Sequence, residues 1–171
     1  MVVRSILPYQ KTVGLPPSKL LPLHPQTLGD FIRVKRVESL QLQSEVARII
    51  GVTEDTITNW ETNRFVPQIN LYPAIFQYLG YNPFQHETES IGGKVRQVRN
   101  CLGLSYEAAG EVFAVHASTI RTWELGRHYP APDREALILA RWRNLPEFLT
   151  SHTHNDETTE KIRITFDDVI Q

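Results

Sequence analysis

The sequence repeats itself with an offset of 63 residues, and this repeat constrains the fold more than any other feature. Aligned without gaps, residues 28–67 and 91–130 are identical at ten of forty positions. The identical pairs are Gly29 with Gly92, Arg33 with Arg96, Arg36 with Arg99, Val52 with Val115, Thr56 with Thr119, Ile57 with Ile120, Trp60 with Trp123, Glu61 with Glu124, Arg64 with Arg127 and Pro67 with Pro130. Two copies of one supersecondary unit are therefore predicted, and one fold must suit both.

Apolar residues recur at helical spacing in four segments of each copy. In the first copy they are Leu28, Phe31 and Ile32, then Val46, Ile49 and Ile50, then Ile57 and Trp60, and lastly Ile75, Phe76 and Leu79 within residues 71–79. In the second copy they are Ile91, Val95, Val98 and Leu102, then Ala109, Val112 and Phe113, then Ile120 and Trp123, and lastly residues 137–142. Gly51 is typical of a helix C-terminus, whereas Thr53 and Pro132 are typical of helix starts. The pattern predicts an all-α fold with two tandem domains of four to five helices each.

Breaks in this pattern predict the domain boundaries. Residues 1–26 contain five prolines and three cationic residues without an acid, so an irregular arm is expected, either lying on the first domain or touching phosphate. The two domains are expected at 27–84 and 85–149, joined by an eleven-residue connection from Gly80 to Ser90 that spans at most about 36–40 Å when extended. Residues 150–171 form a polar tail with a weak strand signal at Ile162, Ile164 and Phe166.

The composition and the motifs present limit the functions that this protein is expected to have. The net charge is −1, the hydrophobic fraction is 41%, and Cys101 is the single cysteine, so a cytoplasmic protein without disulfides or a membrane span is expected. The six histidines, at positions 24, 86, 116, 128, 152 and 154, lack the spacing of a metal site. No phosphate-binding loop, nucleophile elbow or metalloprotease motif occurs. We therefore expect no enzyme activity, no cofactor, no metal and no small-molecule ligand.

The segment around residue 51 carries a family resemblance. Residues 28–67 resemble the lambda-repressor-like (Cro-type, or xenobiotic-response-element-type) helix-turn-helix family of bacteria and phages, through residues 43–47, 51–57 and 60–64. The second copy resembles the same family through residues 104–109 and 118–127. The turn of the first copy is Gly51-Val52-Thr53, whereas the second copy has Ala114, and we expect a different turn geometry there because alanine lacks the freedom of glycine.

The resemblance implies duplex DNA as the partner and assigns DNA contacts in the first copy. Gln43 occupies the position of a glutamine that contacts phosphate and braces a reading side chain, and Ser44 and Thr58 belong to the same surface. Thr53, Glu54, Asp55 and Asn59 occupy the positions that face base edges, whereas Asn63 and Arg64 occupy phosphate-contacting positions. Asn59 suits adenine and the two carboxylates suit cytosine N4, although carboxylates also repel phosphates.

The second copy carries different residues at the implied DNA contacts. Tyr106 replaces the glutamine, and Gly110 replaces a small alanine at the helix crossing. The implied reading face consists of His116, Ala117, Ser118 and Thr122, with Arg121 able to reach guanine or phosphate and Arg127 following the helix. Residues 91–130 carry a formal charge of +2 and residues 28–67 carry −1. Electrostatics therefore favours the second copy as the backbone binder, and side-chain chemistry favours the first as the reader.

Most of the shared residues have a scaffold interpretation. Trp60 and Trp123 are expected in the core. Arg36 with Glu61, and Arg99 with Glu124, are expected to form partly buried ion pairs that join the first helix of each copy to the third. Arg33 and Arg96 are expected to be solvated or to face phosphate.

Two functions are compatible with these features. The first is a bacterial or phage transcription regulator that reads duplex DNA with helices 54–63 and 117–126. It would act as a monomeric pseudo-dimer or a homodimer, and its DNA site would be non-palindromic because the two reading helices differ. The alternative is a protein-interaction or antitoxin-like module that keeps the fold with one or both DNA faces put to another use, as Glu54, Asp55 and the neutral charge balance suggest.

Overall fold

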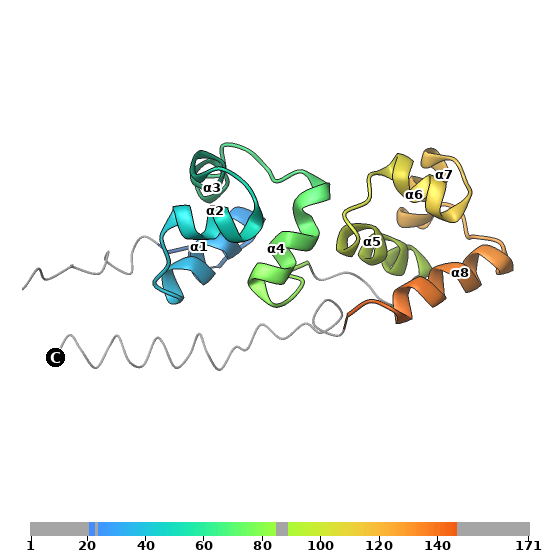
Figure 1. The fold of residues 1–171 in the computed structure, drawn as a ribbon. Helices are drawn as coiled ribbons and strands as arrows, with labels where there is room; N and C mark the ends of the chain where they lie inside the picture. Colours follow the sequence, from blue (N-terminus) through green and yellow to red (C-terminus); the bar gives the residue numbers. More distant parts are fainter. Residues whose placement is uncertain (1–20, 23, 85–88, 147–171) are drawn as a thin grey trace, which may run out of the picture.

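A computed structural model describes residues 21–22, 24–84 and 89–146, and this part of the chain is all-α with no strand. The first unit contains α1 (Leu28–Glu38), α2 (Gln43–Ile50), α3 (Glu54–Glu61), the short 3₁₀ helix η2 (Ile69–Leu71) and α4 (Tyr72–Leu79). The second contains α5 (Ile91–Cys101), α6 (Tyr106–Phe113), α7 (Ala117–Glu124) and α8 (Pro132–Arg143). The units lie side by side, with α4 between α1 and α5 (Figure 1). Most of the predicted arm and all of the predicted tail lie outside the described residues.

The internal repeat is present in the backbone. Helices α5, α6 and α7 begin and end 63 residues after α1, α2 and α3. Left-handed residues recur at the same offset, because Leu40, Gly51 and Asn63 correspond to Gly103, Ala114 and Gly126 and all six have positive φ. Only the fourth helices differ in extent, since α8 is longer than α4 at both ends. The two copies therefore share one backbone plan up to the residues before their fourth helices.

Side-chain caps fix where the helices begin. Thr27 accepts a hydrogen bond from the Asp30 amide while the Asp30 carboxylate accepts one from the Thr27 amide, which is a complete capping box. Ser90 caps α5 at the corresponding position through the Gly93 amide. These caps satisfy amides that have no partner inside the helix, so they set the first turn of each unit.

One continuous hydrophobic core extends through both units. It includes Trp60 and Trp123, which are 3% and 4% exposed, and this confirms their predicted core position. Two residues assigned to the apolar stripes are instead exposed: Ile49 is 55% and Leu102 is 42% exposed. Both lie at the edge of their stripe, near the C-terminal end of α2 and just after α5, where the neighbouring helix no longer covers the side chain.

The first and third helices of each unit cross at a glycine. A Cβ built on Gly29 would lie 1.8 Å from the Trp60 carbonyl oxygen, and one built on Gly92 would lie 2.3 Å from the Trp123 carbonyl oxygen. Any side chain here would push the two backbones apart. The identity of this pair in the repeat is thus explained by close approach of α1 to α3 and of α5 to α7.

The start of the connection between the units is packed into the structure. Asn82 is 2% exposed, Tyr81 stacks edge-on against Phe31 of α1, and Phe84 contacts Tyr72 and Phe76 of α4. The first residues of the predicted connection, 81–84, are therefore held against the first and second units by aromatic and amide side chains. Within the described part of the chain, no helix is long and apolar enough to cross a membrane.

Candidate nucleic-acid interface

Two matching elbows connect the second and third helices of the units. Gly51 ends α2 with φ 84° and ψ 36°, and Ala114 ends α6 with φ 52° and ψ 49°, so both residues are left-handed. The Val52 amide donates to the Ala47 carbonyl, and the Val115 amide donates to the Gly110 carbonyl, both over 2.8–2.9 Å. The expectation of a different turn at Ala114 is therefore wrong. The same hydrogen bond closes both turns and holds the alanine in an unfavourable region.

Replacing Ala114 by glycine is expected to stabilise the protein by about 0.5–1 kcal/mol. A non-glycine residue is strained in this region by about 1–2 kcal/mol, and the substitution relieves this strain. The relief is offset by about 0.4–1 kcal/mol, because glycine has more conformational freedom in the unfolded chain. Ala114 is exposed, so no packing is lost. Urea unfolding of Ala114→Gly measures the gain, and Gly51→Ala is the matched opposite change. A variant no more stable than the parent chain would argue against strain at Ala114.

A buried glutamate organises the interior of each unit. Glu61 accepts hydrogen bonds from Arg36 over 2.6 and 2.7 Å and from the Gln43 amide over 2.9 Å. Glu124 accepts hydrogen bonds from Arg99 over 2.6 and 3.2 Å and from the Tyr106 hydroxyl over 3.0 Å. Both ion pairs predicted from the sequence are therefore present, each joining the first helix of its unit to the third.

Arg96 belongs to the second of these networks. Its Nε lies 3.6 Å from Glu124 Oε2, and its Nη2 donates to the Glu124 backbone carbonyl over 3.0 Å. The side chain of Arg96 is 42% exposed, so it is partly solvated as expected, but the α5–α7 crossing also brings it within reach of the same carboxylate. The guanidinium of Arg99 also stacks on the Tyr106 ring at 4.3 Å. Glu124 is thus held by two arginines and a tyrosine.

Several side chains with implied DNA roles are hydrogen-bonded to other side chains of their own unit. Besides its bond to Glu61, Gln43 accepts a hydrogen bond from the Thr58 hydroxyl over 3.1 Å. Tyr106 is held by Glu124, and burial together with that carboxylate raises the pKa of its hydroxyl. Asn63 accepts from Thr27 over 2.7 Å and donates to Asp30 over 3.1 Å. Their scaffold role was missed because the sequence does not show what lies beneath each position.

The exposed surface of α3 is polar and acidic at its N-terminal end. Thr53, Glu54 and Asp55 are exposed, and Thr53 caps the helix through the Thr56 amide. Asn59, the expected adenine reader, is half-buried, and Ser44 lies half-buried on α2. The two carboxylates suit the positive end of the helix dipole, but they also place negative charge where a phosphate would approach.

The exposed surface of α7 carries no acid. Ser118 and Arg121 are exposed, Ala117 and Thr122 are half-buried, and Glu124, the one acidic residue of the helix, is directed into the core network. The His116 ring caps the helix by accepting from the Ser118 amide over 3.3 Å. The side chain of Arg121 has no partner among the described residues. The surface therefore presents hydroxyl groups and one guanidinium to solvent.

A loop after each third helix adds exposed cationic and large side chains. Arg64, Phe65 and Val66 follow α3, and their counterparts Arg127, His128 and Tyr129 follow α7; all six are exposed. Phe65 is 66% and Tyr129 is 80% exposed. Sequence reasoning predicted the arginines but missed the aromatic residues. The signal was available, since two large side chains precede the shared proline in both copies.

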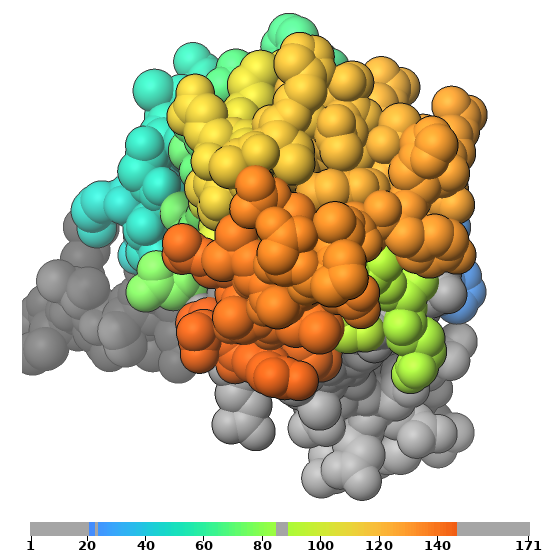
Figure 2. Space-filling view, turned by 90° about the vertical axis from the view of Figure 1, so that its right-hand side faces the viewer, coloured from blue at the N-terminus to red at the C-terminus, as the bar shows by residue number. Residues whose placement is uncertain are grey.

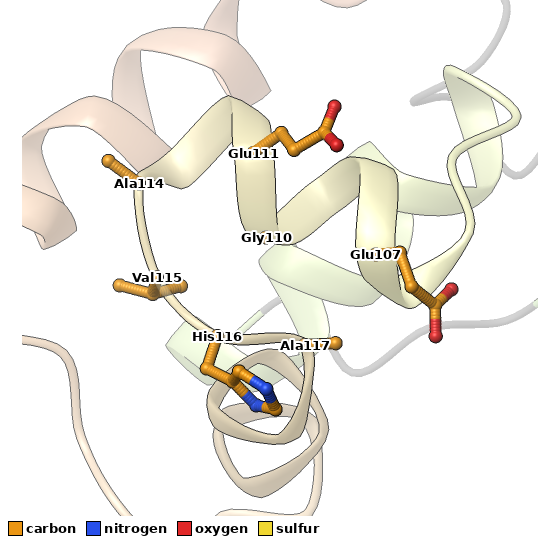
Figure 3. A pocket seen from close by; sticks show the side chains of 7 residues that line it. All are labelled: Glu107, Gly110, Glu111, Ala114, Val115, His116 and Ala117. Carbon is orange, nitrogen blue, oxygen red and sulfur yellow. The ribbon is translucent and has the colours of Figure 1, made fainter.

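An open hollow lies at the elbow of the second unit, between α6 and the start of α7 (Figure 3). It is lined by Glu107, Gly110, Glu111, Ala114, Val115, His116 and Ala117. Hydrogen bonds from its own backbone amide and from Ser105 lower the pKa of the Glu107 carboxyl, which is therefore ionised at neutral pH. With two carboxylates on its rim the hollow repels anions.

Known proteins provide no guide to this interface. No family model, curated protein or solved structure matches the chain. Among the described residues no group of three or more histidine, cysteine or acidic side chains is placed to hold a metal ion.

Proposed function

We propose that this protein binds duplex DNA as a sequence-specific regulator through two helix-turn-helix units, with α7 making the principal contact. The observation that carries the proposal is the surface of α7, which exposes Ser118 and Arg121 and buries its single acid, Glu124. A second helix packed across a first by a tight turn is the arrangement that enters a major groove. Hydroxyl and guanidinium groups at its surface suit contacts to base edges and phosphates.

The charge distribution supports α7 over α3. Of the five cationic residues in 91–130, Arg96 and Arg99 are bound to Glu124, so the positive balance of the second unit rests on Lys94, Arg121 and Arg127. Of these, Arg121 and Arg127 belong to α7 and the loop after it. In the first unit the corresponding helix start carries Glu54 and Asp55, which weaken phosphate binding. The second unit is therefore assigned most of the electrostatic affinity, and the first most of the side-chain discrimination through Asn59.

Replacing Arg121 by alanine is expected to weaken DNA binding by about 5- to 150-fold, because a bidentate arginine contact contributes about 1–3 kcal/mol. Genomic fragments recovered with the full chain and sequenced provide the ligand, and fluorescence anisotropy provides the affinity. Arg141→Ala is the matched control, since it removes the same charge from α8, which lies on the other side of the second unit (Figures 1 and 2). Equal losses in the two variants would show that Arg121 acts only through net charge.

A protein-interaction role is the second candidate, and specific residues of the first unit favour it. Leu40, Leu42 and Ile49 are 77%, 66% and 55% exposed; Leu42 is the N-cap of α2 and Ile49 lies in its last turn. Where exposed apolar side chains form a contiguous patch, the patch marks a protein–protein contact surface. This candidate predicts no binding of genomic fragments at low salt, whereas the DNA proposal predicts binding that weakens as salt rises.

A further inference from the structure

The two units are in close contact, and residues of both units form the interface. Helix α4 of the first unit packs against α5 of the second. A Cβ built on Gly103, in the turn after α5, would lie 3.0 Å from the Pro73 ring and 3.1 Å from the Ile69 carbonyl oxygen. The corresponding residue in the first unit is Leu40, which is 77% exposed. At this position of the repeat, the glycine is therefore found in the unit whose turn is closely approached by the other unit, and the leucine in the unit whose turn is exposed.

The connection is fixed to both units. Tyr81 packs against Phe31 of α1 with ring centroids 6.4 Å apart. The buried amide of Asn82 donates to Cys101 Sγ of α5 over 3.6 Å. Phe84 lies 5.6 Å from the Tyr72 ring of α4. Residues 81–84 thus touch α1, α4 and α5, which leaves the start of the connection little freedom to change the angle between the units.

Burial on α5 shows that the interface reaches the C-terminal end of the helix. Asn100 and Cys101 are 7% and 2% exposed. Their counterparts on α1 are Val37, which is half-buried, and Glu38, which is exposed. Helix α5 is therefore covered by its own unit on one side and by α4 on the other. A core that continues across the contact resists relative motion of the two parts.

The contact is heterologous, meaning that different elements of the two units meet. A two-fold axis would require α8 to pack on α1 in the way that α4 packs on α5. Helix α8 packs instead on α5 and α6 of its own unit, away from α1 (Figure 1). The two copies of this fold are therefore not related by a dyad, and α3 and α7 cannot meet the two halves of an inverted repeat equivalently.

We propose that the two units bind DNA as one rigid body, on a site without dyad symmetry whose two halves stand at a single fixed separation. The inference rests on the proposed function and specifies its DNA partner. Both third helices lie toward the same side of the molecule in the view of Figure 1, so one duplex can contact both. A flexible pair of domains would accept several separations. A rigid pair accepts one, because the half-sites must match both distance and helical phase.

The test is a spacing series on a DNA fragment bound by the full chain. Footprinting locates the two protected blocks, and about 5 or about 10 base pairs are then inserted between them; about 10 base pairs restore the helical face but add about 34 Å. We expect both insertions to weaken binding at least about tenfold. Recovery of affinity with the longer insertion would overturn the proposal, as would a single protected block or an inverted-repeat site. Absence of any binding to the original fragment contradicts the proposed function itself, and the inference falls with it.

Two matched variants test whether the contact between the units causes the strict spacing of the half-sites. Gly103→Leu introduces the side chain found at Leu40 and is expected to separate α4 from the turn after α5, so that the longer insertion is again tolerated. Leu40→Gly makes the reverse change where no unit approaches, and its spacing dependence is expected to equal that of the parent chain. A Gly103→Leu protein that folds, binds and keeps the strict spacing would contradict the role of this interface. If the variant does not fold, the spacing series on the unaltered chain still tests whether the two units bind DNA as one rigid body.

Discussion

Glu124→Gln is expected to lower the free energy of unfolding by about 3–5 kcal/mol, the usual range when one partner of a buried ion pair is removed. The carboxylate accepts hydrogen bonds from Arg99 and Tyr106 and forms an ion pair with Arg96, and Arg99 is 8% exposed. A glutamine supplies one acceptor oxygen and points an amide donor at guanidinium donors. Since small domains are stable by about 5–15 kcal/mol, much of the total would be lost. Urea unfolding monitored by tryptophan fluorescence measures the change.

Two controls separate burial from charge. Asp133→Asn breaks an exposed ion pair on α8, whose Arg134 Nη1 lies 3.5 Å from the Asp133 carboxylate, and should cost less than about 1 kcal/mol. Glu61→Gln should give an intermediate loss, because the side chain of Arg36 is 17% exposed and that of Arg99 is 10% exposed. If Glu124→Gln costs no more than Asp133→Asn, the network around Glu124 is not a source of stability.

Gly29→Ala is expected to destabilise the first unit by about 1–3 kcal/mol, the usual cost of overpacking. The new Cβ would lie 1.8 Å from the Trp60 carbonyl oxygen, so one of two helix backbones must move. Helix propensity predicts the opposite sign, since alanine is favoured over glycine by about 1 kcal/mol in a helix. Thermal unfolding of the purified variant therefore decides between close helix approach and intrinsic propensity.

Gly126→Ala is the matched control for this change. Nothing lies within 4 Å of a Cβ built on Gly126, and its φ of +65° adds only the backbone strain of a left-handed alanine, about 1–2 kcal/mol. Gly92→Ala should resemble Gly29→Ala, because its Cβ would lie 2.3 Å from the Trp123 carbonyl oxygen. A stabilised Gly29→Ala protein would contradict the observed α1–α3 crossing.

Much of the scaffold could be predicted from the sequence because its determinants are local or repeated. Thr53 and Pro132 mark the helix starts seen in the structure, and Gly51 marks a helix end. The repeat also shows that both tryptophans serve the same purpose in the two copies, and both are buried. The Arg36–Glu61 and Arg99–Glu124 pairs followed from identical residues on the first and third helices. In each case the residue type and its spacing carry the information.

Two of the remaining features depend on contacts between segments far apart in the sequence. Arg96 joins the Glu124 network because α5 crosses α7 at Gly92, which no local pattern shows. Residues 80–84 have the composition of a linker, yet Asn82 and Phe84 are packed because α4 and α5 surround them. Ala114 is different, because the local Val115–Gly110 hydrogen bond closes the turn and holds the alanine in the conformation of Gly51.

In the candidate interface, too, some features could be predicted from the sequence and others depend on the folded structure. The sequence located exposed positions of α7, including Ser118 and Arg121, because they lie opposite the buried stripe. It did not reveal that Gln43, Asn63 and Tyr106 are hydrogen-bonded to other side chains of their own unit, nor that Glu107 and Glu111 form the rim of a hollow beside α7. Those roles depend on which side chains the helix crossings bring together.

The salt dependence of binding to recovered genomic fragments tests the central claim most directly. A protein that neutralises several phosphates releases bound counterions, so its affinity should fall steeply between roughly 50 and 200 mM salt, with a log–log slope of several units. Fluorescence anisotropy with the full chain across this range measures the slope. We expect tight binding at the lowest salt and a reduction of at least about a hundredfold across the series. No binding at the lowest salt, or an affinity unchanged by salt, would contradict DNA as the partner.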